Sequence, residues 1–151
     1  MPGPGDDVPA TVVRAGEREL IEAAGVRHLF QLTGGALGLE RFELPPGTVG
    51  ARPHVHSAHD EHFYVLTGRL TVDTAGGPVE TRPGDLVSAP RGAVHGYRNE
   101  DPAVAVTALC LCTPPGYEQY FRDVHAAEAA GAEPTPALLA ELRSRYATES
   151  R

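Results

Sequence analysis

The sequence predicts a single all-β domain, a barrel or sandwich, with two short helices at its carboxyl end. From residue 11 to about 113 the chain consists of short strand-like segments separated by glycine and proline turns, a pattern typical of sandwiches and barrels. Strands do not alternate with long helical segments, so a doubly wound fold is not expected. A chain of 151 residues is long enough for one domain with its own core.

The elements are expected in a simple order along the chain. Residues 1–10 are rich in proline, glycine and aspartate and predict a flexible N-terminus. Residues 17–24 are consistent with a short helix or turn. The β-barrel is expected over residues 11–113, with strands at 11–14, 27–33, 37–44, 51–56, 61–67, 69–74, 78–81, 86–89, 95–99 and 103–112.

Residues 114–151 have a helical pattern and are expected to pack on the barrel. Four apolar residues at helical spacing predict a first helix over about 116–130: Tyr117, Tyr120, Phe121 and Val124. A second helix over about 136–147 is predicted to begin at Thr135-Pro136, an N-cap followed by proline at the first helical position. Neither helix has enough apolar surface to stand alone, so both need the barrel as a partner.

Composition excludes several classes of function. The net charge is −7 and no basic stripe is present, so nucleic acid is not an expected partner. No apolar run approaches the ~20 residues that span a bilayer, and the N-terminus lacks a basic start and an apolar stretch. We therefore expect a cytoplasmic protein without a membrane partner. Lysine is absent, which excludes Schiff-base chemistry on a lysine amine.

One group of residues has the chemistry of a metal site. His54 and His56 are two apart, so in a strand both imidazoles lie on one face. Glu61 follows after a turn, and His95 begins a later strand. Three imidazoles and one carboxylate suit a divalent transition metal, namely Fe, Mn, Ni, Co, Cu or Zn. On an octahedral metal these four ligands leave two positions for water, oxygen or substrate.

The spacing of these residues resembles the two sequence motifs of the cupin superfamily. The first motif is matched by a glycine a few residues upstream, then His54, His56, Glu61 and, after six more residues, Gly68. The match is complete except that the first glycine is one or two residues out of place.

The second cupin motif is matched at every specified position. Gly84 is followed after five residues by Pro90 and Gly92, then by His95 and, after three more residues, by Asn99. The two motifs span about 47–99, and compatible strands extend the resemblance to about 11–113. The resemblance implies a double-stranded β-helix (jelly-roll) barrel in which His54, His56, Glu61 and His95 hold one metal ion. It also implies that Asn99 tethers backbone.

Residues beside the ligands are assigned supporting roles. Arg52, His59 and Asp60 are expected to contact and orient the ligands from outside the metal shell. An alternative is that a strand bulge shifts the register, so that His59 or Asp60 replaces Glu61 as a ligand. His62 is expected to point away from the site, because it is next to Glu61 in a regular strand.

The substrate pocket is expected beside the metal and to be apolar. Phe63 and Val65 share the face of Glu61, and Phe42 and Leu44 share a face of their own strand. We expect these four residues to line the cavity, which favours a flat aromatic or polyketide ligand. The alternative is that the two phenylalanines fill the barrel and leave no cavity there.

A strongly charged substrate would need arginine near the metal. Arg52 and Arg91 are the only arginines close to the ligands in sequence. The tail aromatic residues Tyr117, Tyr120 and Phe121 are expected against the barrel wall or over its mouth.

Two segments carry a narrower resemblance. The run Glu61–Gly68 and the segment Thr113–Glu118 look like single-domain cupins of the quercetin-dioxygenase type. This resemblance implies an oxygenase for a small phenolic, enolisable or polyketide-type substrate, with Glu61 taking the hydroxyl proton. The first alternative is a non-oxidative polyketide cyclase or isomerase that uses the metal as a Lewis acid. The second is a binding or sensor module without turnover.

A homodimer is expected from the resemblance. Single-domain cupins pair their barrels through a sheet edge, and an open edge strand invites a partner. The segment 11–14 or 27–33 is the expected contributor to this interface.

Overall fold

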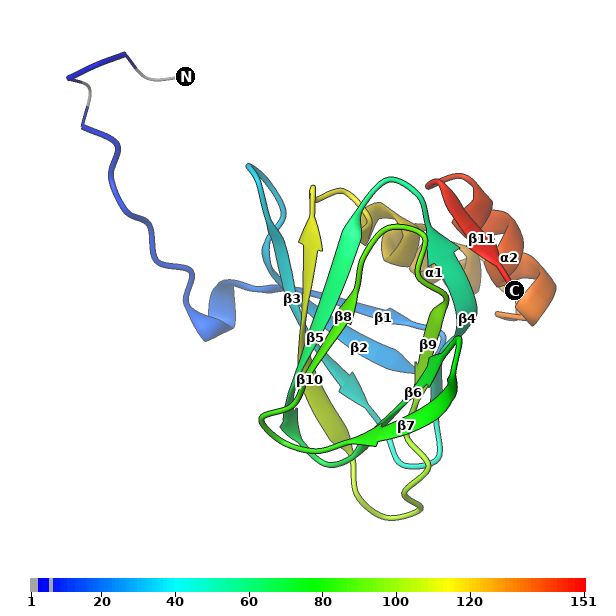
Figure 1. The fold of residues 1–151 in the computed structure, drawn as a ribbon. Coiled ribbons are helices and arrows are strands. Elements are labelled where there is room, and N and C mark those ends of the chain that lie inside the picture. Colours follow the sequence, from blue (N-terminus) through cyan, green and yellow to red (C-terminus); the bar gives the residue numbers. More distant parts are fainter. Residues whose placement is uncertain (1–2, 6) are drawn as a thin grey trace.

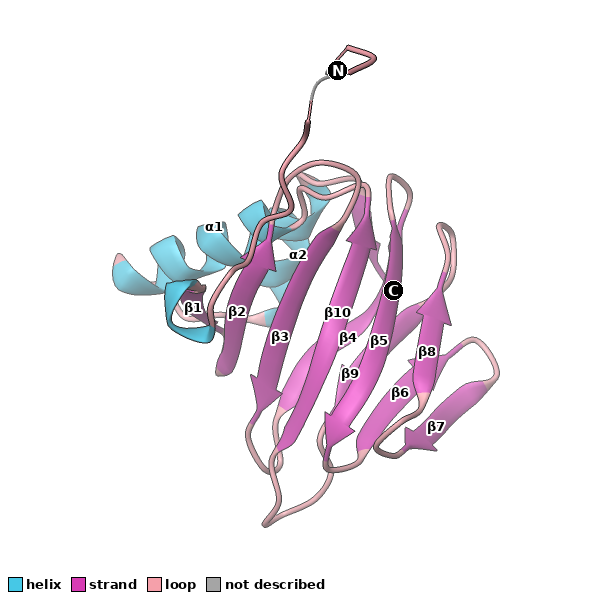
Figure 2. Cartoon of the chain, turned by 90° about the vertical axis from the view of Figure 1, so that its left-hand side faces the viewer, coloured by secondary structure: helices cyan, strands magenta, loops and turns pink. Residues whose placement is uncertain are grey.

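Two antiparallel β-sheets face each other and enclose the interior of a barrel (Figures 1 and 2). The computed structural model describes residues 3–5 and 7–151. One sheet has the strand order β1-β2-β3-β10-β5-β8, and the other has the order β11-β4-β9-β6-β7. The two helices lie together at one side, next to β1 and β2 (Figure 2). The predicted all-β fold class with two carboxyl-terminal helices is confirmed.

The strands that build the barrel are short, and glycine or proline lies in most of the turns between them. The first six are β1 (Glu19–Ala23), β2 (Val26–Leu32), β3 (Gly38–Leu44), β4 (Val49–His56), β5 (Asp60–Thr67) and β6 (Leu70–Thr74). The others are β7 (Gly77–Thr81), β8 (Leu86–Ala89), β9 (His95–Arg98), β10 (Val106–Thr113) and β11 (Thr148–Ser150). The helices are α1 (Glu118–Ala129) and α2 (Pro136–Ser144).

The interior of the barrel is filled by inward-facing side chains of both sheets. Strands β3 and β5 bury alternate residues, as expected for a sheet with one face on the core. Phe42, Leu44, Phe63 and Val65 are 0–1% exposed and belong to this core. The Phe42 and Phe63 rings meet edge to face, with centroids 6.0 Å apart.

The helices cover a second apolar cluster at one side of the barrel. Tyr120 and Val124 of α1 and Leu142 of α2 are buried against Ile21 and Phe30 of the first hairpin. Thr135 caps α2 by accepting a hydrogen bond from the backbone nitrogen of Leu138 at 3.2 Å, as its sequence predicts. The tail thus contributes its apolar face to the barrel wall.

The first hairpin corrects the expectation for residues 17–24. Glu17 ends a short 3-10 helix (Ala15–Glu17), and residues 19–23 form strand β1 because Ala24 and Gly25 both have positive φ (49° and 81°) and close a two-residue hairpin with β2. Residues 11–14 form no strand. Of the predicted flexible segment 1–10, residues 1–2 and 6 lie outside the described part of the chain, and the others are exposed.

These strand assignments bear on the expected dimer interface. Strand β2 pairs with β1 and β3 within the chain, so the segment 27–33 offers no free edge. The free edges of the six-stranded sheet belong to β1 and β8. The homodimer stays a prediction, and in the described chain neither segment that the sequence favoured presents a free strand edge.

The end of the chain adds a strand that the pattern of apolar residues did not indicate. The second helix ends at Ser144, and β11 (Thr148–Ser150) then pairs with β4. In Figure 1 this strand runs beside β4 at the edge of the barrel. The last residues of the chain therefore lie next to the histidines of β4.

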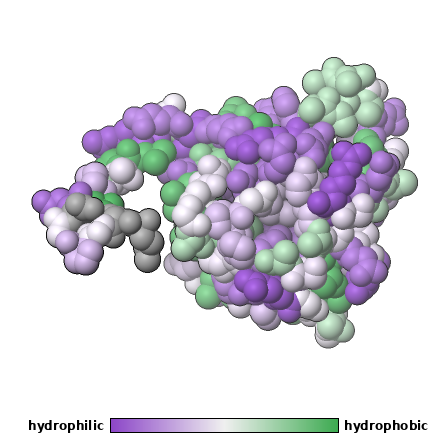
Figure 3. Space-filling view, turned by 90° about the horizontal axis from the view of Figure 1, so that it is seen from above, coloured by the Kyte–Doolittle hydropathy of each residue, from purple (hydrophilic) through white to green (hydrophobic). Residues whose placement is uncertain are grey.

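The outer surface is mixed in character. On the face shown in Figure 3, hydrophilic and hydrophobic residues are interspersed, without one broad hydrophobic patch. Among the described residues, neither helix has the length and apolar character that crossing a membrane requires.

Asn99 ties together the loops at one end of the barrel, as expected from the second motif. It is 2% exposed, and its amide nitrogen lies 3.2, 3.1 and 2.8 Å from the carbonyl oxygens of Leu44, Pro45 and Val104. Its side-chain oxygen accepts a hydrogen bond from the backbone nitrogen of Asp101 at 3.0 Å. Backbone groups that no strand satisfies are paired in this way.

Replacing Asn99 tests this role. We expect Asn99→Ala to lower the free energy of unfolding by about 1–3 kcal/mol, because buried carbonyl oxygens lose their donor. Urea denaturation followed by circular dichroism measures the change. Glu100→Ala, at the exposed neighbouring position, is the control and should change stability by less than about 0.5 kcal/mol. Equal effects of the two substitutions would contradict the tethering role.

Candidate metal centre

Strand β4 carries two of the four clustered residues. The strand has a register irregularity between Ala51 and His54, where Pro53 cannot donate a ladder hydrogen bond. Beyond it, alternation resumes, so that His54 and His56 both face the interior and are 3% and 2% exposed. The irregularity allows the strand to re-aim its last residues into the barrel.

His95 reaches the same point from the neighbouring strand. Its Cα is the direct partner of the His54 Cα across β4 and β9, and the two rings lie 4.4 Å apart. The next residue, Gly96, has no room for a side chain, since a Cβ there would lie 2.7 Å from the Ala51 carbonyl oxygen. The close approach of the two backbones therefore depends on glycine.

Glu61 comes from the opposite sheet. It lies in β5, is 4% exposed, and shares its inward face with Phe63 and Val65, as the alternation predicts. Its Oε2 atom is 2.5 Å from His56 Nε2 and 3.2 Å from His95 Nε2. Its other oxygen accepts a hydrogen bond from the Cys110 thiol at 3.2 Å. The cluster is thus formed by residues of both sheets.

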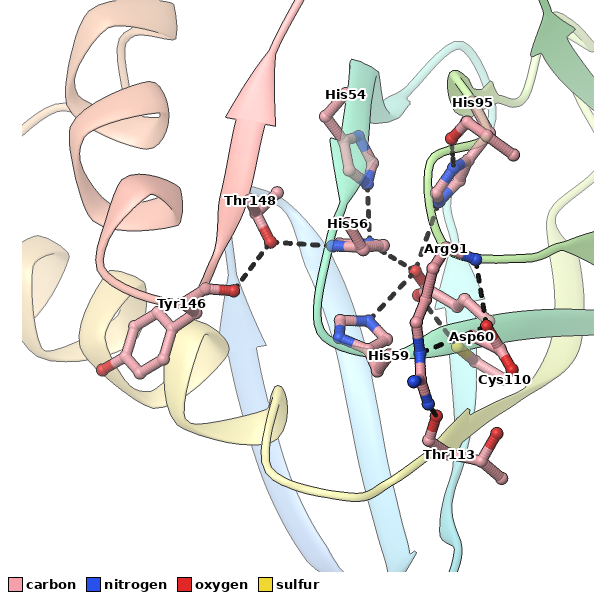
Figure 4. Close-up of polar contacts among 12 residues, drawn as sticks. His54, His56, His59, Asp60, Arg91, His95, Cys110, Thr113, Tyr146 and Thr148 are labelled. Carbon is pink, nitrogen blue, oxygen red and sulfur yellow. Dashed lines mark hydrogen bonds and ion pairs between the residues drawn. The ribbon is translucent and has the colours of Figure 1, made fainter.

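The outer nitrogens of the three imidazoles are all engaged, and Figure 4 shows the contact of His56 with Thr148. In His54 and His95, Nδ1 donates to the backbone carbonyl oxygen two residues earlier, at 2.7 and 3.0 Å. In His56, Nδ1 lies 2.7 Å from Thr148 Oγ1, whose own hydrogen is donated to the Tyr146 carbonyl oxygen. Thr148 must therefore accept, and all three Nδ1 atoms carry a proton.

A neutral imidazole with a proton on Nδ1 presents a lone pair on Nε2. The Nε2 atoms of His54 and His56 face each other at 3.1 Å, so at most one of them can carry a proton. The ligand atoms of His54, His56, Glu61 and His95 all lie within 4.8 Å of one another. Two donors at ~2.1 Å from one ion and at right angles are separated by about 3 Å, which matches these contacts. The residues therefore fit a divalent metal.

The protonation equilibria agree with this chemistry. Burial, aided by His95, lowers the pKa of His54 to about 3, and burial also lowers the pKa of His56. Burial opposes the charge of Glu61, but the nearby imidazoles of His56, His59 and His95 hold its pKa well below the usual value. Burial likewise opposes protonation of His95, and the Glu61 carboxylate reverses this and raises its pKa. The cluster is one carboxylate anion surrounded by imidazoles, a set of donors that suits a divalent cation.

The three residues that were predicted to support the ligands make different contacts. His59 is 6% exposed, and its Nε2 has no hydrogen-bond partner and lies 3.7 Å from Glu61 Oε2. Burial opposes its charge, yet proximity to Cys112 and Glu61 raises its pKa to about 9. Arg52 contributes its carbonyl oxygen to His54, and its side chain is exposed. Neither His59 nor a shifted register displaces Glu61 from the cluster.

Asp60 supports the loop that precedes His95. Its carboxylate accepts a hydrogen bond from the Arg91 backbone nitrogen at 2.9 Å and lies 3.4 Å from the Arg91 guanidinium. The Arg91 side chain also donates to the Thr113 carbonyl oxygen (Figure 4). The contact connects β5 and β10 to the loop, so Asp60 acts on the loop and Arg91 does not enter the site.

The predicted pocket lining is corrected by the structure. Phe42, Leu44, Phe63 and Val65 fill the barrel core, and the cavity that His54 and Glu61 reach is lined by other residues. Each of the four side chains is enclosed by other core side chains. This outcome agrees with the alternative interpretation, in which the two phenylalanines fill the barrel. The space beside the cluster lies instead toward the helices.

We call this space the inner cavity; its volume is about 20 Å³, enough for about one water molecule. His54 and Glu61 reach it from the cluster, and Ala51 and Tyr97 belong to the barrel strands beside them. The remaining wall comes from the first hairpin and the tail, and includes His28, Tyr117, Tyr120, Phe121, Val124, Leu139 and Arg143. The tail aromatic residues thus close the mouth of the barrel, as the sequence suggested.

Four functional features were not identified from the sequence. Thr148 fixes His56, Cys110 binds Glu61, Arg143 lines the inner cavity, and His28 is paired with Glu40 at 2.9 Å. No motif marks any of them, because each depends on contacts between residues far apart in the chain.

Comparison with known proteins agrees with the fold and the cluster. The protein-family model described as "Cupin domain" matches residues 40–112, a segment that contains all four clustered residues. KdgF from Halomonas sp. has the same fold, with a TM-score of 0.64 and 23% identity over 72% of this chain and 99% of that one. Residues 40–112, just under half of the chain, are therefore similar to the cupin domain.

Two curated relatives share part of the sequence. Quercetin 2,3-dioxygenase of Bacillus subtilis (strain 168) is 33% identical over 69 residues, which is 46% of this chain and 20% of that protein. Quercetin 2,3-dioxygenase of Aspergillus japonicus is 32% identical over 78 residues, or 48% of this chain and 22% of that protein. The chain thus spans about a fifth of the length of the curated relatives it matches.

Metal content tests the cluster directly. We expect His95→Ala to reduce the divalent metal bound per chain, because it removes one of the converging donors. His62→Ala is the matched control, since His62 lies in β5 next to Glu61 but faces outward. Elemental analysis after dialysis measures both. Equal losses in the two variants would show that the cluster does not hold the metal.

The Thr148 contact makes a second prediction. Thr148→Val removes the acceptor that holds the His56 ring and should weaken metal affinity by about 10–100-fold. Thr148→Ser keeps the hydroxyl and should retain the affinity, and Ser150→Ala on the same short strand should have no effect. Competition with a chromogenic chelator gives the three affinities. Wild-type affinity in Thr148→Val would remove β11 from the site.

Proposed function

We propose that the protein is a metal-dependent enzyme, and that its first activity is oxygenation of a small phenolic or enolisable substrate. The observation that carries this proposal is the buried cluster of three histidines and one glutamate that opens on the inner cavity. Such an arrangement combines a metal-binding set with a partly enclosed, mainly apolar space. A non-catalytic module would not need both.

A bound divalent metal would supply Lewis acidity and, for redox-active ions, reactivity toward dioxygen. The residues of the chain have other tasks. The carboxylate of Glu61 stays ionised and is the proposed acceptor of the substrate hydroxyl proton. Hydrogen bonds to the three Nδ1 atoms hold the imidazoles in place, and the aromatic wall from α1 limits access of water.

Similarity to two quercetin 2,3-dioxygenases supports oxygenation over the alternatives. The non-oxidative cyclase or isomerase uses the same four ligands, so it is separated from the oxygenase by the products and not by the site.

Oxygen consumption tests the proposal. The protein is freed of metal, reloaded with Fe, Mn, Ni, Co, Cu or Zn in turn, and supplied with small phenols and enolisable ketones in an oxygen electrode. We expect substrate-dependent oxygen uptake with at least one redox-active metal, a loss of about 100-fold or more in His95→Ala, and unchanged uptake in His62→Ala. Product formation without oxygen uptake would favour the cyclase or isomerase. Tight ligand binding without any product would favour the sensor.

A further inference from the structure

Arg143 is a buried cation without an acidic partner. It lies in the last turn of α2 and is 4% exposed, and its Nε atom is buried with no hydrogen-bond partner. Among the described residues, no ion pair or hydrogen bond involves its guanidinium group. A guanidinium has five N–H donors and remains charged at every physiological pH, so this arrangement leaves a charge uncompensated.

Two features of the fold stabilise the guanidinium in part. Its carbon atom lies 5.3 Å from the centre of the Tyr120 ring, a cation–π contact, and a basic residue near the end of a helix is favoured by the helix dipole. Neither feature offers an acceptor for the N–H groups. Burying a charge is costly unless it is both paired and hydrogen-bonded, so helix packing alone does not account for arginine here.

The position of Arg143 connects it to the metal centre. It lines the inner cavity together with His54 and Glu61. It does not form an ion pair with Glu61, whose carboxylate is engaged by His56, His95 and Cys110. The other buried acid near the cavity, Glu40, is paired with His28. The acids that could neutralise Arg143 from within the chain are thus already occupied.

A surface hollow leads toward the same residue. This hollow has a volume of about 450 Å³ and shares Arg143, Leu139 and Ala51 with the inner cavity. Arg52 also lines it, and no acidic residue does, although the net charge of the chain is −7. Arg52 has no ion-pair partner among the described residues. The positive charges of Arg52 and Arg143 at this hollow therefore favour the approach of anions.

We propose that Arg143 binds the carboxylate of the substrate, and that the substrate is a small monocarboxylic acid whose other end faces the metal centre. The proposal names the substrate class of the enzyme proposed above and rests on it in that respect. A planar carboxylate can accept two parallel hydrogen bonds from one guanidinium. The apolar body would lie against Tyr117, Phe121 and Val124.

This assignment revises the expectation of an uncharged ligand. That expectation considered only arginines close to the ligands in sequence, namely Arg52 and Arg91. Arg143 is far from the ligands in the chain, and the packing of α2 on the barrel brings it to the cavity wall.

Calorimetric titration of the zinc-loaded protein tests the proposal without turnover. Benzoate is the probe, and benzamide, of the same shape but uncharged, is its control. We expect benzoate to bind and benzamide not to bind. Arg143→Met should weaken benzoate binding by about tenfold or more. Arg143→Lys keeps the charge but loses the paired N–H donors of the guanidinium, so it should weaken benzoate binding by a smaller factor. Arg145→Met is the control, since Arg145 is exposed, paired with Glu141 and absent from the inner cavity.

The melting temperature separates binding from a purely structural role. Removal of an uncompensated buried charge should leave the melting temperature of Arg143→Met equal to or above that of the wild type. A marked drop, together with unchanged benzoate affinity, would assign Arg143 to packing and overturn the proposal.

Other outcomes of the titration are equally decisive. Equal binding of benzoate and benzamide, or no binding of benzoate at millimolar concentration, would also reject the proposal. Phenyl phosphate binding more tightly than benzoate would overturn the carboxylate assignment. Failure of the proposed oxygenase would show in oxygen uptake and would leave these titrations unchanged, because zinc is redox-inert and binding is measured without turnover.

Discussion

The structure depends on the convergence of three imidazole lone pairs and one carboxylate at a buried point between the two sheets. Hydrogen bonds on the Nδ1 atoms turn the Nε2 atoms of His54, His56 and His95 inward, where like dipoles oppose one another. The Glu61 carboxylate adds negative charge at the same point, and a bound cation would offset the repulsion. The close strand pairing at Gly96 and the irregularity near Pro53 favour this orientation of the histidine side chains.

The carboxyl-terminal residues complete the wall of the cavity beside the metal centre. Strand β11 pairs with β4 and fixes His56 through Thr148, while α1 and α2 cover the barrel mouth with aromatic side chains. The same tail brings the unpaired guanidinium of Arg143 to the cavity that His54 and Glu61 reach. Metal-binding chemistry therefore comes from the strands, and the features that would select a substrate come mainly from the tail.

Much of the fold and of the cluster could be predicted from the sequence, because local spacing carries that information. Alternation along a strand places His54 and His56 on one face, and glycine and proline turns mark the short strands. Motif spacing singled out Glu61 and His95 as the residues to meet them, and the structure brings all four together. Helical periodicity indicated both tail helices. In each case neighbouring residues determine the local conformation.

Other features were decided only by tertiary structure. Residues 19–23 become a strand because β2 offers a partner and the Ala24-Gly25 turn closes the hairpin. Phe63 shares the inward face of Glu61 but is enclosed by core packing, so facing inward did not mean lining a cavity. Arg143 reaches the metal-centre cavity through the docking of α2, with no signal in the sequence around it. Periodicity specifies which face a side chain occupies, whereas the packing of distant elements decides which faces enclose a space and which charges remain unpaired.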